Sequence, residues 1–142
     1  MKVLIDTCII IDALQKREKF YKDAETIFLL CANQQFDGFL TAKSFTDIFY
    51  LTHRITHDNE KTRTILSKLC SLFDILDTTK KDIYNAIFSN SPNFEDAVMI
   101  ETGMRSKIDY IITRNTNDYS KSRISVYTPT KFIELLSNQN SK

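Results

Sequence analysis

Four aspartates are the residues of this sequence best suited to act together in chemistry: Asp6, Asp47, Asp96 and Asp118. They are far apart in the chain. Asp6 and Asp118 come shortly after segments expected to form strands, Asp47 lies in a helix that follows one, and Asp96 lies in the first turn of a helix that follows a chain break at residues 91–93. Carboxylate oxygens suit Mg²⁺ or Mn²⁺. A phosphate-binding loop, a nucleophile elbow and a Cys/His set with zinc spacing are all absent from the sequence. The acids therefore favour an oxygen-only site for a divalent ion.

Each aspartate also has a structural explanation when it is taken alone. Asp6, placed between a strand and a helix, could cap that helix, and Asp96 could stand in a capping arrangement at a helix start. Asp47 lies four residues after Lys43, so a surface ion pair is the alternative there. Asp118 could be an ordinary turn residue. The metal-site hypothesis consequently depends on the four acids meeting in space.

The elements that must bring them together alternate along the chain. Apolar runs indicate strands at residues 3–5, 36–40, 73–76, 110–112 and 125–127. Helical periodicity indicates helices at residues 9–14, 20–31, 45–52, 65–72, 82–88, 94–104 and 129–136. This alternation is typical of an α/β fold, a three-layer α/β/α sandwich with a central, mainly parallel sheet. In such sheets ligands bind beyond the carboxyl ends of the strands, where these acids occur.

Composition limits the other possibilities. A chain of 142 residues is the size of one domain, which we expect to span residues 1–137, followed by a polar C-terminal tail at 138–142. The net charge of +1 is not that of a protein held on nucleic acid by bulk electrostatics. The three cysteines form no disulfide framework or paired motif, and no apolar run is as long as a membrane span. A cytoplasmic protein with no membrane partner is the prediction.

Four segments resemble the sequence motifs of PIN domains, in the same order. Residues 3–7 with 9–12 resemble the opening of that family, and residues 41–50 resemble the helix that bears its second acid. Residues 94–97 resemble the third acidic motif, and residues 111–115 with 118–119 resemble the fourth. The resemblance covers nearly the whole chain and is strongest to small bacterial PIN proteins, among them VapC-like toxins.

The resemblance implies a metal-dependent endoribonuclease, the toxin of a toxin–antitoxin pair. It implies Asp6, Asp47, Asp96 and Asp118 as acids that bind Mg²⁺ or Mn²⁺. Our hypothesis is that Asp6 and Asp96 hold the principal ion and that Asp47 and Asp118 complete the site directly or through water. It further implies an RNA substrate, a small antitoxin partner and a homodimer. An ion held in this way would lower the pKa of a bound water and relieve charge on the phosphodiester.

Several residues around these acids are given supporting parts by the same resemblance. Thr7, Thr113 and Asn115 are expected as polar supports, and Arg114 as a candidate phosphate contact. The sequence departs from the family pattern at the residues that follow: relatives commonly have Asn at Cys8, Glu at Asp47, an acid at Asn115 and Phe at Tyr119.

Two other functions compete with this interpretation. The departures would fit a PIN scaffold that has lost activity and binds RNA or protein. A different α/β enzyme, such as a receiver-like domain with Asp6 as phosphoryl acceptor, is the third interpretation. It is weakened because a second adjacent acid and a strand-end Lys are absent.

Overall fold

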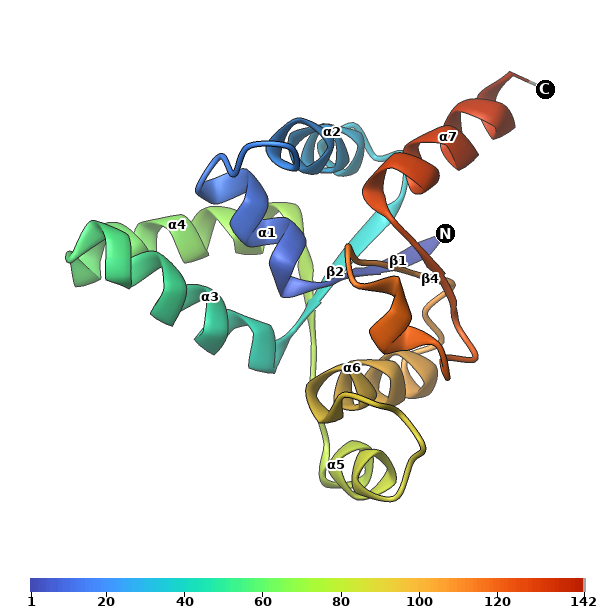
Figure 1. Ribbon diagram of the computed structural model, residues 1–142. Helices are drawn as coiled ribbons and strands as arrows, with labels where there is room; N and C mark the ends of the chain where they lie inside the picture. Colours follow the sequence, from blue (N-terminus) through green and yellow to red (C-terminus); the bar gives the residue numbers. More distant parts are fainter. Residues whose placement is uncertain (142) are drawn as a thin grey trace.

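Five short strands pair into one parallel sheet in the computed structural model, which describes residues 1–141 (Figure 1). Their order across the sheet is β3-β2-β1-β4-β5. The strands are β1 (Lys2–Ile5), β2 (Asp37–Thr41), β3 (Asp74–Leu76), β4 (Tyr110–Ile112) and β5 (Ser125–Tyr127). The parallel sheet predicted from the apolar runs is therefore confirmed.

Seven α-helices accompany the sheet in this part of the chain. They are α1 (Thr7–Leu14), α2 (Tyr21–Ala32), α3 (Ala42–Thr56), α4 (Asn59–Leu72), α5 (Lys80–Ile87), α6 (Phe94–Arg105) and α7 (Pro129–Asn140). A short 3-10 helix, η1 (Thr116–Tyr119), lies in the polar stretch after β4, where no helix was expected. Helix α7 continues to Asn140, inside the segment expected as a tail, whose last residue lies outside the described residues. None of the helices within residues 1–141 has both the length and the apolarity needed to cross a bilayer.

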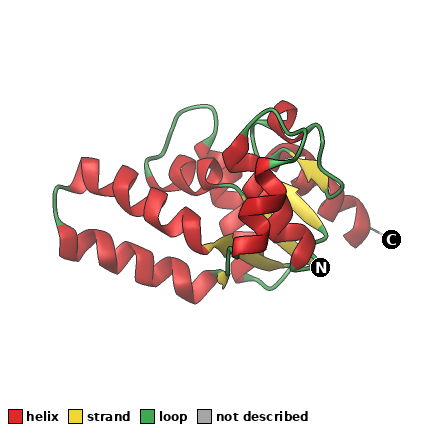
Figure 2. Cartoon of the chain, turned by 90° about the horizontal axis from the view of Figure 1, so that it is seen from below, coloured by secondary structure: helices red, strands yellow, loops and turns green. Residues whose placement is uncertain are grey.

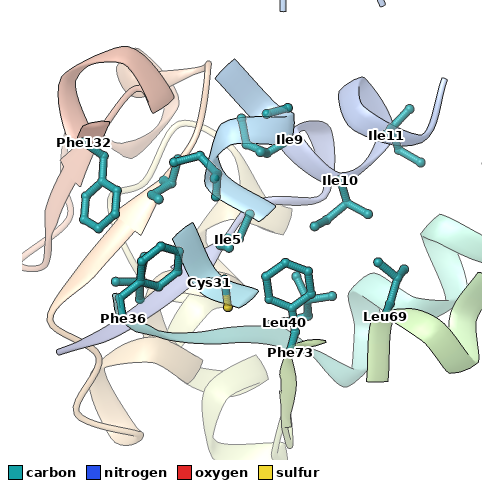
Figure 3. Packing of buried hydrophobic residues seen from close by; sticks show 14 of the residues in the cluster. Ile5, Ile9, Ile10, Ile11, Cys31, Phe36, Leu40, Leu69, Phe73 and Phe132 are labelled. Carbon is teal, nitrogen blue, oxygen red and sulfur yellow. The ribbon is translucent and has the colours of Figure 1, made fainter. Parts of the chain in front are cut away.

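The sheet is covered on both faces because successive side chains of a strand point to opposite sides. Val3 and Ile5 belong to a core with residues of α1, α2 and α7, shown in part in Figure 3. Leu4 and Ile111 belong to a second core with residues of α6 and of the segment after β4. Figure 1 shows α1, α2 and α7 on one side of the sheet and α6, backed by α5, on the other. The three-layer arrangement is thus confirmed.

Helices α3 and α4 form an antiparallel pair that extends away from the sheet (Figures 1 and 2). Thr41, the last residue of β2, caps α3 by accepting a hydrogen bond from the backbone N–H of Ser44. His57 ends α3 in the left-handed region, with φ of 52°, and Asp58 caps α4. Because α3 begins directly after β2, its first turn lies next to the carboxyl end of that strand.

Candidate functional site

Asp6, the first candidate acid, follows the strand at which the strand order reverses. The chain leaves β1 for β2 on one side, whereas β4 pairs with β1 on the other. Asp6 follows β1 and Thr113 follows β4, and the Thr113 hydroxyl donates a hydrogen bond to Asp6 Oδ2 at 2.7 Å. The Asp6 side chain makes no capping hydrogen bond to α1, so the capping explanation does not describe it. This carboxylate, only 8% exposed, lies at the position where ligands bind in parallel sheets.

The second acid meets it from the start of α6. Asn93 caps that helix by accepting a hydrogen bond from the backbone N–H of Asp96 at 3.2 Å, which leaves the Asp96 side chain free of the cap. Burial, and after it the charge of Asp6, raises the pKa of Asp96 to about 6, although a hydrogen bond from Tyr119 opposes this. A like charge raises the pKa of a carboxyl group in this way only at short range. Asp96 is therefore a buried, electrostatically strained carboxyl group close to Asp6.

Tyr119 is a part of the site to which the sequence analysis gave no role. Its ring is 2% exposed in the core under α6, and its hydroxyl donates to Met99 Sδ at 3.4 Å. Burial, and then the charges of Asp6 and Asp96, raise the pKa of this phenol far above its usual range. The hydroxyl is therefore a permanent proton donor beside the two acids. Its only sequence signal was a Tyr where relatives commonly have Phe.

A cavity of about 340 Å³ opens over these acids. Strand-end residues, the first turns of α1, α3 and α6, and the exposed Tyr50 form its walls. The charged residues that line it are Asp6, Arg17, Lys43, Asp47, Glu95 and Asp96. Three of the four predicted acids thus share one cavity.

The third acid of the cavity is already paired. Lys43 Nζ lies 2.7 Å from Asp47 Oδ2 and 3.5 Å from Glu95 Oε1, so it links α3 to α6 across the cavity. The ion pair that the spacing of Lys43 and Asp47 suggested is confirmed, and Asp47 nevertheless lines the cavity. Glu95 was not among the predicted site residues, although it stands next to Asp96.

The residues that resemble the fourth PIN motif, Asn115 and Asp118 among them, do not line the cavity. Asp118 is half-buried in η1 and contributes, after other causes, to the raised pKa of Asp96, but it is not part of the cavity wall. Asn115 is exposed, and its backbone N–H donates to the Thr113 hydroxyl at 3.0 Å. Thr7 lines the cavity and donates to the Ser44 hydroxyl at 3.1 Å, which ties α1 to α3.

Arg114 is paired with Asp12 and is not part of the cavity wall. Its Nε and Nη2 donate to the two oxygens of Asp12 at 2.6 and 3.2 Å, and its guanidinium lies 4.1 Å from the centre of the Phe20 ring. The Asp12 side chain is fully buried, so its role is that of an ion-pair partner inside the protein. The guanidinium therefore faces a different hollow, together with Lys19 and Phe20.

Cys8, which stands where relatives commonly have Asn, is a neutral thiol. Burial, and next the charge of Asp6, raises its pKa to about 11. The Cys8 Sγ atom lies 3.9 Å from the Thr113 hydroxyl. This side chain adds no charge to the cavity.

The residues present fit a divalent cation in part. Among residues 1–141, Asp6 and Asp96 have no salt-bridge partner, so two buried carboxylates line the same cavity without a cation paired to either. Mg²⁺ commonly uses one or two carboxylates and keeps several waters, which this pair can supply. A set of three or more His, Cys, Asp or Glu ligands is not assembled within that part of the chain. Asp6 and Asp96 could therefore act as the carboxylate ligands of such an ion, and Asp47 and Glu95 line the same cavity.

Comparisons with known proteins agree with this architecture. Residues 2–117 match the family described as PIN domain. Curated proteins include none with significant sequence similarity.

Several solved structures share the fold. A toxin–antitoxin complex from Klebsiella pneumoniae is 21% identical, with 89% of this chain and 97% of that chain covered and a TM-score of 0.65. FitAcB from Neisseria gonorrhoeae is 19% identical over 90% and 98% of the two chains, with a TM-score of 0.65. Mycobacterium tuberculosis VapC20, a toxin that cleaves the sarcin-ricin loop, is 12% identical over 77% and 86%, with a TM-score of 0.60.

Proposed function

Because the chain belongs to the PIN domain family, we propose that it is a metal-dependent endoribonuclease that cleaves RNA phosphodiester bonds. The observation that carries this proposal is the buried pair of Asp6 and Asp96, whose charges lack a cationic partner within residues 1–141. Keeping two such charges together without a cation costs free energy, which a divalent ion would remove. The family match over residues 2–117 disfavours a receiver-like phosphoryl acceptor.

In this proposal Asp6 and Asp96 hold Mg²⁺ or Mn²⁺, and Asp47 and Asp118 complete the site directly or through water. The bound ion supplies an activated water and charge relief on the phosphate. Thr113 fixes the orientation of the Asp6 carboxylate by its hydrogen bond, and the buried Tyr119 phenol stays neutral beside Asp96. The first turn of α6 adds the positive end of a helix dipole next to Asp96.

We also propose that the protein is the toxin of a toxin–antitoxin pair and acts in the cytoplasm. Two of the structures named above support this, since one is a toxin–antitoxin complex and another is a toxin that cleaves RNA. The near-neutral net charge of +1 also fits a protein whose RNA binding is local, or is completed by a second copy in a homodimer. A small antitoxin would cover or fill the acidic cavity.

The test is cleavage of a panel of tRNAs and structured ribosomal RNA fragments with Mg²⁺, with Mn²⁺ and with EDTA. Wild type is compared with Asp6→Asn and Asp96→Asn, and with Asp74→Asn as a matched control on the exposed edge strand β3. We expect wild type to cleave RNA only when metal is present. Both site variants should show no more cleavage than wild type in EDTA, and the Asp74→Asn control should cleave like wild type. Metal-independent cleavage, or full activity in either site variant, would refute the proposal.

A scaffold function is the second candidate. The ion pair between Lys43 and Asp47 favours it, because Lys43 neutralises the charge of Asp47. A protein of this kind would bind RNA or a partner protein without cutting. RNA binding by gel shift, together with intact RNA under all metal conditions of the same panel, would select this function.

A further inference from the structure

Lys43 pairs with one acid of the proposed metal site, Asp47, and with the neighbouring Glu95, and the inference drawn from it depends on the proposed function. Its ammonium lies between Asp47 on α3 and Glu95 on α6, at 2.7 and 3.5 Å, inside the cavity that Asp6 and Asp96 line. In this position one positive charge stands where a divalent ion or an RNA phosphate would arrive. The same cation thus opposes the ion and attracts the phosphate.

We propose that Lys43 is an exchangeable cation that neutralises Asp47 in the free protein and moves to a substrate phosphate when a divalent ion takes Asp47. Lys43 is then the phosphate-binding residue of the site. It is also the reason why the free protein presents two carboxylates to the ion rather than three.

The pair of Lys43 and Asp47 has the properties of a reversible contact. Both side chains are about two-fifths exposed, at 41% and 39%, and exposed ion pairs contribute little free energy. A lysine ammonium on a flexible stem can turn to a new partner without breaking a planar, two-point contact. The second partner, Glu95, is 73% exposed and holds Lys43 only loosely.

Arg114, unlike Lys43, makes a two-point contact with a buried partner. Arg114 makes two hydrogen bonds to Asp12, whose side chain has no exposed surface. Moving Arg114 to a phosphate would leave the buried Asp12 carboxylate with only Arg17, at 3.8 Å, as a cationic partner, which is costly. Phosphate recognition at the acids therefore falls to Lys43, with Arg17 as the other cation of the cavity wall.

The first experiment measures Mn²⁺ binding to the free protein by calorimetry at pH 7.5, without RNA. Lys43→Met should tighten binding about three- to fivefold, the effect expected from removing a partly exposed ion pair and its competing charge. Lys61→Met on α4 removes the same charge at an exposed position away from the cavity, so it should leave the affinity unchanged. In an Asp47→Asn background the Lys43 substitution should bring no gain.

The second experiment measures binding of a fluorescent single-stranded RNA by anisotropy, with Ca²⁺ as the divalent ion and RNA integrity checked on gels. With Ca²⁺, Lys43→Met should weaken binding several-fold and reduce the slope of log affinity against log salt by about one. In EDTA the variant and wild type should bind RNA equally, because Lys43 stays with Asp47. Lys61→Met should follow wild type in both conditions.

The outcomes separate this inference from the proposed function. If wild type and Lys43→Met bind Mn²⁺ with the same affinity, or if Lys43→Met weakens RNA binding equally with and without Ca²⁺, the exchange is refuted and the metal site remains. If neither protein binds Mn²⁺, the metal site and the exchange both fail.

Discussion

Asp82 and Asp96 are both buried aspartates in the first turn of a helix, but the protein compensates only one of the two charges. Asp82 accepts hydrogen bonds from the Arg105 guanidinium, and these outweigh the effect of burial, so its pKa is lowered. Asp96 has another acid opposite, and its pKa is raised to about 6 by burial and by Asp6. An uncompensated charge of this kind is a sign of a functional site rather than of packing.

Asp96→Asn should therefore stabilise the metal-free protein at pH 7.5. A raised pKa in the folded state means that the folded protein binds more protons, so the free energy of unfolding falls as pH rises from about 4 to above 6. Each pKa unit corresponds to about 1.4 kcal/mol. After allowing for the lost attraction between the carboxylate and the helix N-terminus, we expect a gain of about 2 kcal/mol in urea unfolding with EDTA.

The gain should shrink by more than half at pH 4.5, where the wild-type carboxyl is protonated in the folded protein. Asp74→Asn, which removes an exposed carboxylate, should show no such difference between the two pH values. Equal stability changes for Asp96→Asn at both pH values would mean that Asp96 is not strained.

At the scale of elements, α5 and α6 form the layer that presents Asp96. Asp82 closes a capping box with Thr79 at the start of α5, and it also accepts a hydrogen bond from Thr102 of α6 at 3.2 Å. Arg105, from the last turn of α6, completes the contact with Nε at 3.1 Å from Asp82 Oδ1. One carboxylate thus joins the start of α5 to the far end of α6.

Asp82→Ala should lower the free energy of unfolding by about 2–3 kcal/mol, since it removes a cap together with an ion pair whose carboxylate is buried and whose arginine is exposed. Asp58→Ala, which removes only the cap of the exposed α4 start, should cost about 1 kcal/mol. Urea unfolding at pH 7 measures both. The difference between them should narrow as pH falls through the lowered pKa of Asp82, because its stabilising charge is then lost. Equal costs at pH 7 would show that the Arg105 contact adds nothing.

At the scale of the whole molecule, the main core leaves no room for a side chain at one small residue, Gly38. Gly38 in β2 lies under Cys31 of α2 and Phe73, which Figure 3 shows in the same cluster. A Cβ atom at this position would lie 2.6 Å from Cys31 Sγ and 2.7 Å from Phe73 Cδ1. Both neighbours are buried, so neither can move aside cheaply.

Gly38→Ala should therefore destabilise the protein by about 2–3 kcal/mol through overpacking. Gly103→Ala is the matched comparison. Its Cβ would lie 3.0 Å from Ile124 Cδ1, the end of that side chain, and at ordinary contact distances of 3.4 Å from Leu4 Cδ2 and 3.6 Å from Ile108 Cβ. Alanine is also about 1 kcal/mol better than glycine inside a helix. We expect Gly103→Ala to change the free energy of unfolding by less than about 1 kcal/mol, measured by urea titration. A Gly38 variant as stable as the Gly103 variant would contradict the packing described above.

The strands and helices could be predicted from local signals alone. Apolar runs and helical periods place the five strands and most helix ends to within about four residues, whereas α4 begins at Asn59 rather than at residue 65. The position of Asp6 also follows from local signals, because parallel strands bring their carboxyl ends to one edge of the sheet, whereas Asp96 comes from the start of α6, which follows α5. The pairing of Lys43 with Asp47 required only a spacing of four residues on a helix.

Only the tertiary structure decided which side chains meet across the chain. The contact between Arg114 and Asp12 spans 102 residues, and periodicity contains no information about such a pair. The placement of the Tyr119 hydroxyl beside Asp96 and of Glu95 beside Lys43 likewise depends on how α6 packs against the sheet and α3. Side-chain partners of this kind are selected by packing and by the cost of burying a charge, and both are properties of the assembled fold.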